Sequence, residues 1–360
     1  MLPVLFNIVL QPAWALYALA LLAVGIGAWQ WRGVRAGGGT PAKALEAFAT
    51  WTVGAAVVFF LAVRTLGEPG HQDLFHLTRP IVVPLHTYGL LVASAFLIAM
   101  QMAARAAERS GLDRDRVLDL SFWILLAAMV GSRVLFIAVN WDEYAHDPLS
   151  IFAFWKGGLV FYGGFLGAVA CSVFYMRRHG MEFFPYADAM GPSVAIGQAL
   201  GRLGCFSAGC CWGGACDPHF ALAARFPPDS LAYQSQVTNH LIESGAATTI
   251  PIHPTQLYES IGCACIFLFL NLWRSRKRFH GELLALYLML YAPLRATVEV
   301  LRGDEERGRV LNFLGPWARH AWWNLSTSES ISVGIFLAGV AVYVTQSRKA
   351  ALLQQQPAAA

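Results

Sequence analysis

The chain has 360 residues, of which 56% are hydrophobic and only 13% are charged. Soluble domains usually carry about 25% charged residues, so this composition excludes an ordinary soluble globule and predicts a polytopic membrane protein. The formal net charge is only +4 and basic residues are not interleaved with aromatic ones, which argues against a nucleic-acid partner.

Nine apolar stretches are long enough to cross a bilayer as helices, which takes roughly 20 residues each. They fall at 13–31, 46–63, 82–104, 119–139, 158–176, 187–206, 256–273, 282–301 and 329–346. The sixth stretch is the weakest of them, because it contains Asp188, Pro192, Gln198 and Arg202. We therefore expect an all-α polytopic membrane protein with about nine transmembrane helices.

Short basic clusters follow every second stretch, beginning with the first. If all nine stretches cross the membrane, these clusters lie on one side, and the positive-inside rule makes that side cytoplasmic. The N-terminus is then expected outside and the C-terminus in the cytoplasm.

The chain divides into three parts by composition. Residues 1–80 carry no unusual motif and are interpreted as an extra N-terminal transmembrane helical pair. Residues 81–346 form the main membrane domain, with a long loop at 207–255 expected on the outer face, where long loops tend to be functional. Residues 347–360 are predicted to be a disordered cytoplasmic tail.

Polar residues from five stretches fall near the outer leaflet when depth is counted at about 1.5 Å per residue. They are Tyr88, Tyr162, Arg202, Glu259, Arg295, Glu299 and Arg302. The last three are spaced i, i+4 and i+7, which predicts one helical stripe. A single charge near a helix end often snorkels or forms a structural pair. Several charges at one depth instead favour a shared cavity, and arginines favour a phosphate ligand such as a phospholipid headgroup.

Four of the seven cysteines fall within twelve residues: Cys205, Cys210, Cys211 and Cys216. A disulfide within this cluster is one alternative at an outer membrane face, and buried free thiols are another. A metal site is disfavoured because the C-x4-C-C-x4-C spacing lacks the usual CxxC pairs. A redox function of these thiols is the remaining alternative, and no metal ligand is assigned.

Six motifs of this sequence occur together in the order and spacing of one family. They are Tyr88-Gly89, Gly131-Ser132-Arg133, the glycine-rich runs 157–164 and 201–213, the run 253–259, and the Arg-x-x-x-Glu-x-x-Arg pattern that starts at Arg295. Over residues 84–346 the chain resembles the prolipoprotein diacylglyceryl transferases, inner-membrane enzymes of bacterial lipoprotein maturation.

The resemblance implies a seven-helix family core, here with two extra N-terminal helices, in the bacterial inner (plasma) membrane. It implies transfer of a diacylglyceryl group from phosphatidylglycerol to the lipobox cysteine thiol of a prolipoprotein. The products are a thioether and glycerol-1-phosphate. The expected partners are phosphatidylglycerol, prolipoprotein signal peptides and membrane lipid, without a cofactor or metal, and the protein is expected to be a monomer.

The resemblance also assigns roles to residues. The expected catalytic residues are Tyr162, Arg202, Arg295 and Glu299. Both arginines would hold the phosphate, and the glutamates Glu259 and Glu299 would orient them. The expected substrate-binding residues are Tyr88, His86, Glu259, Arg302 and Gly213.

This chain departs from the family pattern at two places. Tyr162 stands where many members carry the histidine favoured as general base, and a tyrosine is a weak base at neutral pH. His86 is the alternative base. Cys205, Ala208 and Cys210 stand where the family commonly has Asn, Asn and Glu. Two further hypotheses follow: a catalytically silent relative that binds phospholipid or lipoprotein precursor, and a membrane thiol oxidoreductase.

Overall fold

The computed structural model describes residues 4–10, 81–145, 151, 158, 160–302 and 326–355. For 4–10 and 81–86 it describes the backbone alone. The first two predicted spans, 13–31 and 46–63, lie outside the described residues. The chain forms two compact units, one of Met1–Leu5, His86–Leu125 and Val169–Ala360, the other of Phe6–Leu85 and Leu126–Ala168.

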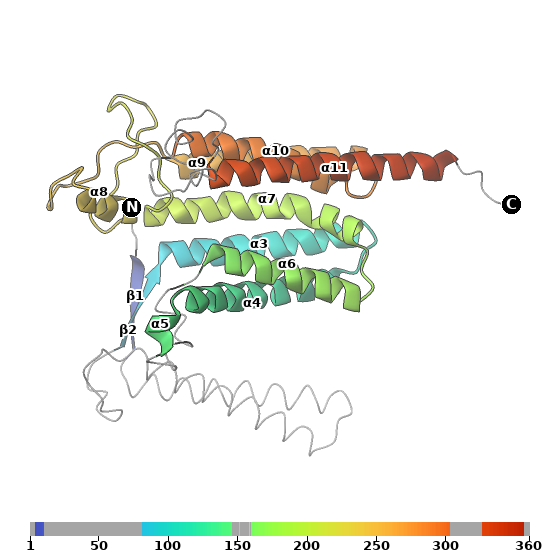
Figure 1. The fold of residues 1–360 in the computed structure, drawn as a ribbon, viewed down its shortest axis with the longest axis horizontal. Coiled ribbons are helices and arrows are strands. Elements are labelled where there is room, and N and C mark those ends of the chain that lie inside the picture. The colour runs from blue at the N-terminus through green and yellow to red at the C-terminus, as the bar shows by residue number, and fades with distance from the viewer. Residues whose placement is uncertain are drawn as a thin grey trace, which may run out of the picture. The chain divides into compact units, whose positions relative to one another are not determined.

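The described residues are mostly helical (Figure 1). The helices are α3 (Thr87–Arg109), α4 (Arg114–Val139), α5 (Trp141–Ala145), α6 (Phe161–Arg178), α7 (Phe183–Ala208), α8 (Leu231–Thr238), α9 (Thr255–Trp273), α10 (Glu282–Val300) and α11 (Thr327–Gln355). A 3-10 turn over Arg274–Arg276 continues α9. The strands β1 (Val4–Leu10) and β2 (Ile81–His86) pair with each other.

Seven of the nine predicted spans are helices at the expected places. Five helical segments of the described chain are long and apolar enough to cross a membrane: Thr87–Arg109, Arg114–Val139, Thr255–Arg276, Glu282–Val300 and Thr327–Gln354. The helices α6 and α7 occupy predicted spans but are not among these five. The protein is therefore a helical membrane protein, and the count of nine stays a prediction.

The predicted start of the third span was wrong, and the strands β1 and β2 were not predicted. Helix α3 begins at Thr87 rather than at residue 82. The β-branched run before it ends in Pro84, which cannot donate a helical hydrogen bond and favours extended chain.

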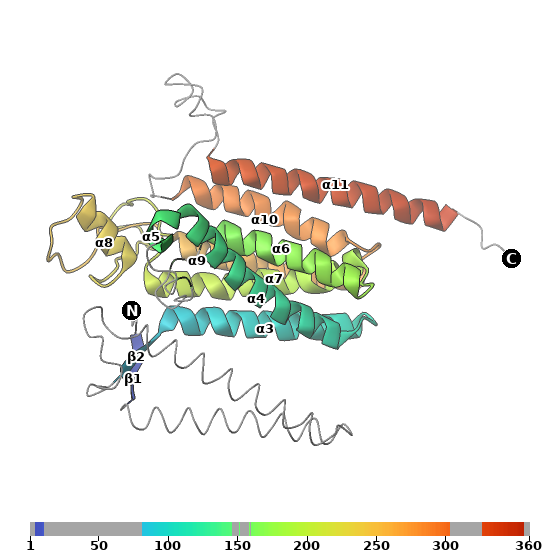
Figure 2. The same ribbon diagram turned by 60° about the horizontal axis from the view of Figure 1, so that its bottom comes forward.

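Helix α7 packs against α3, α9 and α10, and α10 packs against α11 (Figures 1 and 2). Small residues permit the close approach to α3. A Cβ added at Gly197 would lie 3.1 Å from the Cβ of Ala99. On the other face of the bundle, α7, α9 and α10 share an apolar core made of Ala195, Ile266, Leu270, Leu283 and Tyr287.

A buried carboxylate fixes the N-terminus of α10 to α7. Asp188 on α7 accepts hydrogen bonds from the backbone N–H of Gly281 (2.7 Å) and of Leu284 (3.0 Å), and pairs with Lys277 at 3.2 Å. These N–H groups have no partner within their own helix, so a carboxylate there both caps and complements the helix dipole. Asp188 is thus a structural residue at the opposite end from the site described below.

Within the second unit, the backbones of α4 and α6 lie in direct contact at glycine residues. A Cβ on Gly131 would collide with the carbonyl oxygen of Gly163, and one on Gly163 would collide with that of Gly131. Beside them Arg133 is buried, donates from Nε to the carbonyl of Ile151 (2.9 Å) and lies over the ring of Tyr144. These contacts give the Gly131-Ser132-Arg133 motif a packing role.

The long loop 207–255 is more ordered than its sequence indicates. It contains α8 and a small core of its own, where Phe226, Ala232 and Ile252 are fully buried. Its chain also forms bridges from Ile252 to Ala215 and Ala224. Figure 1 shows this segment at the end of the bundle where α7 ends and α9 begins.

The prediction of a disordered tail at 347–360 is wrong for residues 347–355, because α11 continues to Gln355. Residues 347–355 are rich in Ala, Leu, Gln, Lys and Arg, which are strong helix formers. The first helix breaker in this tail is Pro357, and residues 356–360 lie outside the described part of the chain.

Candidate active site

A buried ion pair joins α7 to α9 at the end of the bundle that carries α8. Arg202 Nη2 lies 2.9 Å from Glu259 Oε1. The Glu259 side chain is only 2% exposed, and that of Arg202 is 22% exposed. The hydroxyl of Tyr291 on α10 donates a second hydrogen bond, of 3.3 Å, to the same oxygen. A carboxylate this deeply buried must be paired, so Glu259 fixes the position of the guanidinium.

A second ion pair lies on α10. Arg295 Nη1 is 2.7 Å from Glu299 Oε2, one helical turn further along, and both side chains are largely buried. The same Nη1 atom is buried and makes no hydrogen bond of acceptable geometry in the described structure. Arg295 is therefore held by a close ion pair rather than by an aligned hydrogen bond.

Arg302 does not extend the α10 stripe, contrary to the prediction. Helix α10 ends at Val300, and the next residues pair with the loop after α7. The N–H of Gly214 donates to the carbonyl of Leu301 (2.9 Å), and Arg302 forms an antiparallel bridge with Gly213. The N–H groups of Leu301 and Arg302 donate to the carbonyls of Val298 and Glu299, so the last turn is tighter than an α-helix and the i+7 spacing on one face does not apply.

Gly213 lies between two chain segments that leave no room for a side chain. A Cβ on it would be 2.6 Å from the carbonyl oxygen of His253 and 2.8 Å from that of Leu301. Its own N–H donates to His253 at 2.9 Å. Gly213 thus ties the start of α9 to the end of α10, and its expected place at the site is consistent with this geometry.

Tyr88 lies in the first turn of α3, against the last turns of α7. A Cβ on Gly204 would be 3.4 Å from Cδ2 of Tyr88, and Tyr88 interacts electrostatically with Arg202. The ring is 44% exposed. The structure thus brings together Tyr88, Arg202 and Glu259, three of the expected residues.

Two expected residues are not placed against this group. His86 is the last residue of β2, and its side chain lies outside the described residues. Tyr162 is the second residue of α6, belongs to the second unit, and has a half-exposed ring.

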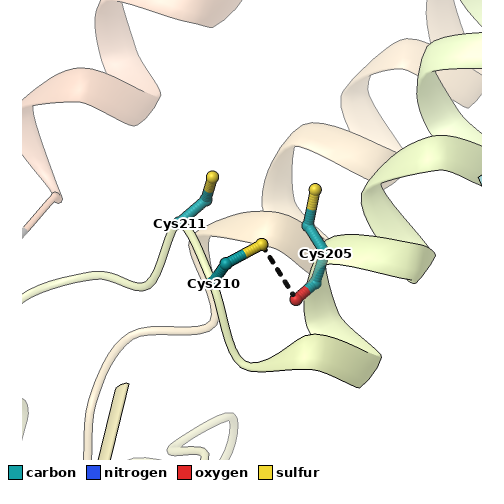
Figure 3. Close-up of side chains that lie close together, drawn as sticks. All are labelled: Cys205, Cys210 and Cys211. Carbon is teal, nitrogen blue, oxygen red and sulfur yellow. Dashed lines mark hydrogen bonds between the residues drawn. The ribbon is translucent and has the colours of Figure 1, made fainter. Parts of the chain in front are cut away.

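Three thiols gather at the end of α7 (Figure 3). The Sγ atoms of Cys205, Cys210 and Cys211, called here the cysteine triad, all lie within 4.8 Å of one another. All three are free thiols in the structure, and Cys216 is not part of the group. The spacing of the cysteines indicated one cluster of four and did not distinguish this set of three.

The end of α7 explains why the triad forms. Gly209 adopts the left-handed conformation, with φ 64°. The N–H of Cys210 then donates to the carbonyl of Cys205 (3.1 Å) and that of Gly209 to Phe206 (3.2 Å), which is a Schellman motif. This turn folds the chain back over the last helical turn, so Cys210 lies beside Cys205.

Two side chains at the start of α9 donate hydrogen bonds to the backbone of this turn. Gln256 Nε2 donates to the carbonyl of Cys210 (2.6 Å), and Thr255 Oγ1 donates to that of Cys211 (2.8 Å). Hydrogen bonds from the thiols of Cys205 and Cys210 lower the pKa of Cys211, and the charges of Arg302 and Arg202 act in the same direction.

Neither Tyr291 nor Gln256 was singled out from sequence, although Tyr291 precedes Arg295 by one helical turn.

The chain is a helical membrane protein in which the ends of α7 and α10 and the start of α9 gather two arginine–glutamate pairs and three thiols. Residues 74–345 match the family described as prolipoprotein diacylglyceryl transferase. The chain belongs to this family, as its motifs predicted.

Proteins named phosphatidylglycerol–prolipoprotein diacylglyceryl transferase are similar to this chain over most of its length. Those of Shigella boydii serotype 4 (strain Sb227) and of Escherichia coli (strain K12 / DH10B) are each 32% identical over 277 residues. The similarity covers 74% of this chain and 91% of each relative.

Proposed function

We propose that the protein transfers the diacylglyceryl group of phosphatidylglycerol to the lipobox cysteine thiol of prolipoproteins, with release of glycerol-1-phosphate. The observation that carries the proposal is the placement of two buried arginine–glutamate pairs near one end of a helical bundle, in a chain of this family. The names of the similar proteins supply the two substrates.

The arginines suit the leaving group of this reaction. As the bond between carbon and phosphate oxygen breaks, negative charge builds on the phosphate, and fixed guanidinium donors stabilise it. Glu259 and Glu299 hold Arg202 and Arg295 in place before substrate arrives, so little reorganisation is needed. Arg295, positioned by its ion pair with Glu299, is the second guanidinium that we assign to a phosphate oxygen.

The other expected residues form the walls in this proposal. Tyr88 and Gly213 border the headgroup pocket, and Arg302 adds positive charge beside the cysteine triad. Tyr162 is assigned to contact the prolipoprotein thiol as a hydrogen-bonding group or weak base, and His86 is the alternative base. No nucleic acid takes part, and the protein acts as a monomer.

We place the protein in the bacterial inner membrane with this site near the periplasmic leaflet. The basic residues support this orientation. Arg109 ends α3, Arg274 follows α9, and Arg348 lies in the last turns of α11, all away from the end that carries α8. The positive-inside rule puts that opposite end, and the C-terminus, in the cytoplasm.

Complementation tests the proposal. A bacterial strain depleted of its own transferase would receive this chain, the Arg295→Ala variant or the Arg348→Ala variant. Arg348 is an exposed arginine on α11 and serves as the matched control. Charged hydrogen bonds contribute about 1.5–3 kcal/mol, so the Arg295 variant should transfer roughly 10- to 150-fold more slowly at equal expression.

Rescue by the parent chain and by Arg348→Ala, with failure of Arg295→Ala, supports the proposal. No rescue by a well-expressed parent chain that still binds phosphatidylglycerol vesicles would instead identify a catalytically silent lipid-binding relative.

A further inference from the structure

We propose that the cysteine triad binds a zinc ion that keeps one coordination position open for the prolipoprotein thiol. This inference rests on the proposed function, because it assigns that open position to the thiol substrate. It gives Cys205, Cys210 and Cys211 a catalytic task and supplies an activated thiolate without a histidine base.

The spacing of the three sulfurs fits one ion. Zinc–thiolate bonds of about 2.3 Å in a tetrahedral shell place neighbouring sulfurs about 3.8 Å apart. The triad sulfurs lie within 4.8 Å of one another, so small rotations about the Cα–Cβ bonds bring them to a common centre. The donor set consists of thiols alone, which favours zinc over hard cations such as magnesium or calcium.

The backbone that carries the triad is fixed from outside, as metal sites require. The Schellman motif sets Cys210 against the end of α7, and the carbonyls of Cys210 and Cys211 accept from Gln256 and Thr255. The N–H of Ala232 in α8 donates to the carbonyl of Gly209 at 2.9 Å. Segments from α7, α8 and α9 therefore hold the turn before any ion binds.

The surrounding charge also fits. Three thiolates and one zinc ion carry a net charge of −1, and a bound substrate thiolate makes it −2. The charges of Arg302 and Arg202 favour a thiolate at Cys211, and Arg302 leads because Arg202 is already paired with Glu259. Positive charge beside the triad therefore suits an anionic zinc–thiolate centre.

Three protein ligands and one open position are the arrangement of catalytic zinc sites, whereas structural sites are closed by four. The prolipoprotein thiol loses its proton to water when its sulfur coordinates, because a metal-bound thiol is deprotonated. That sulfur then attacks the glycerol carbon of phosphatidylglycerol. A C–S bond forms, the C–O bond to phosphate breaks, and its electron pair leaves on glycerol-1-phosphate. The step involves no oxidation or reduction.

Metal content gives the first test. Full-length protein, purified in detergent micelles without chelators, would be analysed for zinc beside a Cys205→Ser/Cys210→Ser/Cys211→Ser variant and a Cys216→Ser control. Cys216 belongs to the same loop but lies outside the triad. We expect about one zinc ion per chain in the parent and in the control, and at least about tenfold less in the triple variant.

Cobalt substitution gives a test that does not require catalysis. Tetrahedral Co²⁺ with thiolate ligands absorbs visible light, and its spectrum changes when a ligand is added. A synthetic lipobox peptide should change the spectrum of the Co²⁺-loaded protein, whereas the same peptide with serine in place of its cysteine should not. Zinc removal should slow diacylglyceryl transfer by about 10²- to 10⁴-fold, the contribution expected of the base that the ion replaces.

The outcomes separate this inference from the proposed function. Full transfer activity in zinc-free protein, or a disulfide within the triad of active protein, overturns the zinc site and leaves the transferase standing. Zinc binding and a cysteine-dependent cobalt spectrum without any transfer support the site and overturn the transferase. If the triple variant does not accumulate, the zinc content and cobalt spectrum of the parent protein decide.

Discussion

The Arg202–Glu259 pair should show strong energetic coupling, which a double-mutant cycle measures. Glu259→Leu leaves Arg202 with its charge and no carboxylate, and Arg202→Leu leaves a carboxylate that is 2% exposed without its cation. Breaking a fully buried pair costs about 3–5 kcal/mol. Because the arginine side chain is 22% exposed and so partly hydrated, we expect about 3 kcal/mol for Glu259→Leu and about 4 for Arg202→Leu.

The double variant should be far more stable than the sum of the two single changes. Replacing both partners by leucine removes both buried charges, which is often nearly neutral for folding. Unfolding in mixed detergent micelles would give all four free energies, and the expected coupling is at least about 2 kcal/mol. Transfer should be lost in all three variants. Additive effects, or a Glu259→Leu variant as stable as the parent, would refute the description of this pair as buried and mutually dependent.

Three further predictions concern other parts of the chain. Gly213→Ala should destabilise the protein by about 1–3 kcal/mol, because the new methyl group meets two backbone carbonyls that cannot rotate away. Thermal unfolding measures this loss, and an unchanged unfolding midpoint would contradict the crowding. Asp188→Asn should lower the free energy of unfolding by about 1–3 kcal/mol, because α10 is capped more weakly. The transfer rate per folded molecule should stay unchanged, because Asp188 lies at the other end of the bundle. A specific loss of turnover would speak against a purely structural role. If zinc activates the thiol, Tyr162→Phe should change the transfer rate by less than about threefold in a radiolabelled-lipid assay. A loss of about 10²-fold or more would identify Tyr162 as the general base.

Seven long helices of the described residues and the ion pair within α10 could be predicted from the sequence. The i, i+4 spacing of Arg295 and Glu299 on one helix predicts their ion pair, which the structure has at 2.7 Å. The Arg202–Glu259 pair joins α7 to α9, so helix spacing does not predict it, and the resemblance implied only that the glutamates orient the arginines. The helical place of Arg302 was wrong, because α10 ends at Val300 and Arg302 pairs with Gly213 of the loop after α7.

The cysteine triad could not be predicted from spacing. Its formation depends on the left-handed turn at Gly209 and on the positive φ of 59° at Cys211, which together fold the chain back on the helix end. A linear pattern of four cysteines carries no mark of that fold, so Cys216 seemed equivalent to the other three. The contact of Tyr291 with Glu259 likewise depends on how α9 and α10 lie together.

The polarity of α7 has a consequence for how the protein is made. This 26-residue helix is not among the five described segments apolar enough to cross a bilayer, yet it packs against α3, α9 and α10. On its own it gains little from lipid, so its insertion depends on neighbours that are synthesised both before and after it. A substitution that weakens those neighbours would leave Asp188 and Arg202 facing lipid, and the nascent chain would become a target for membrane proteases before any effect on catalysis could appear.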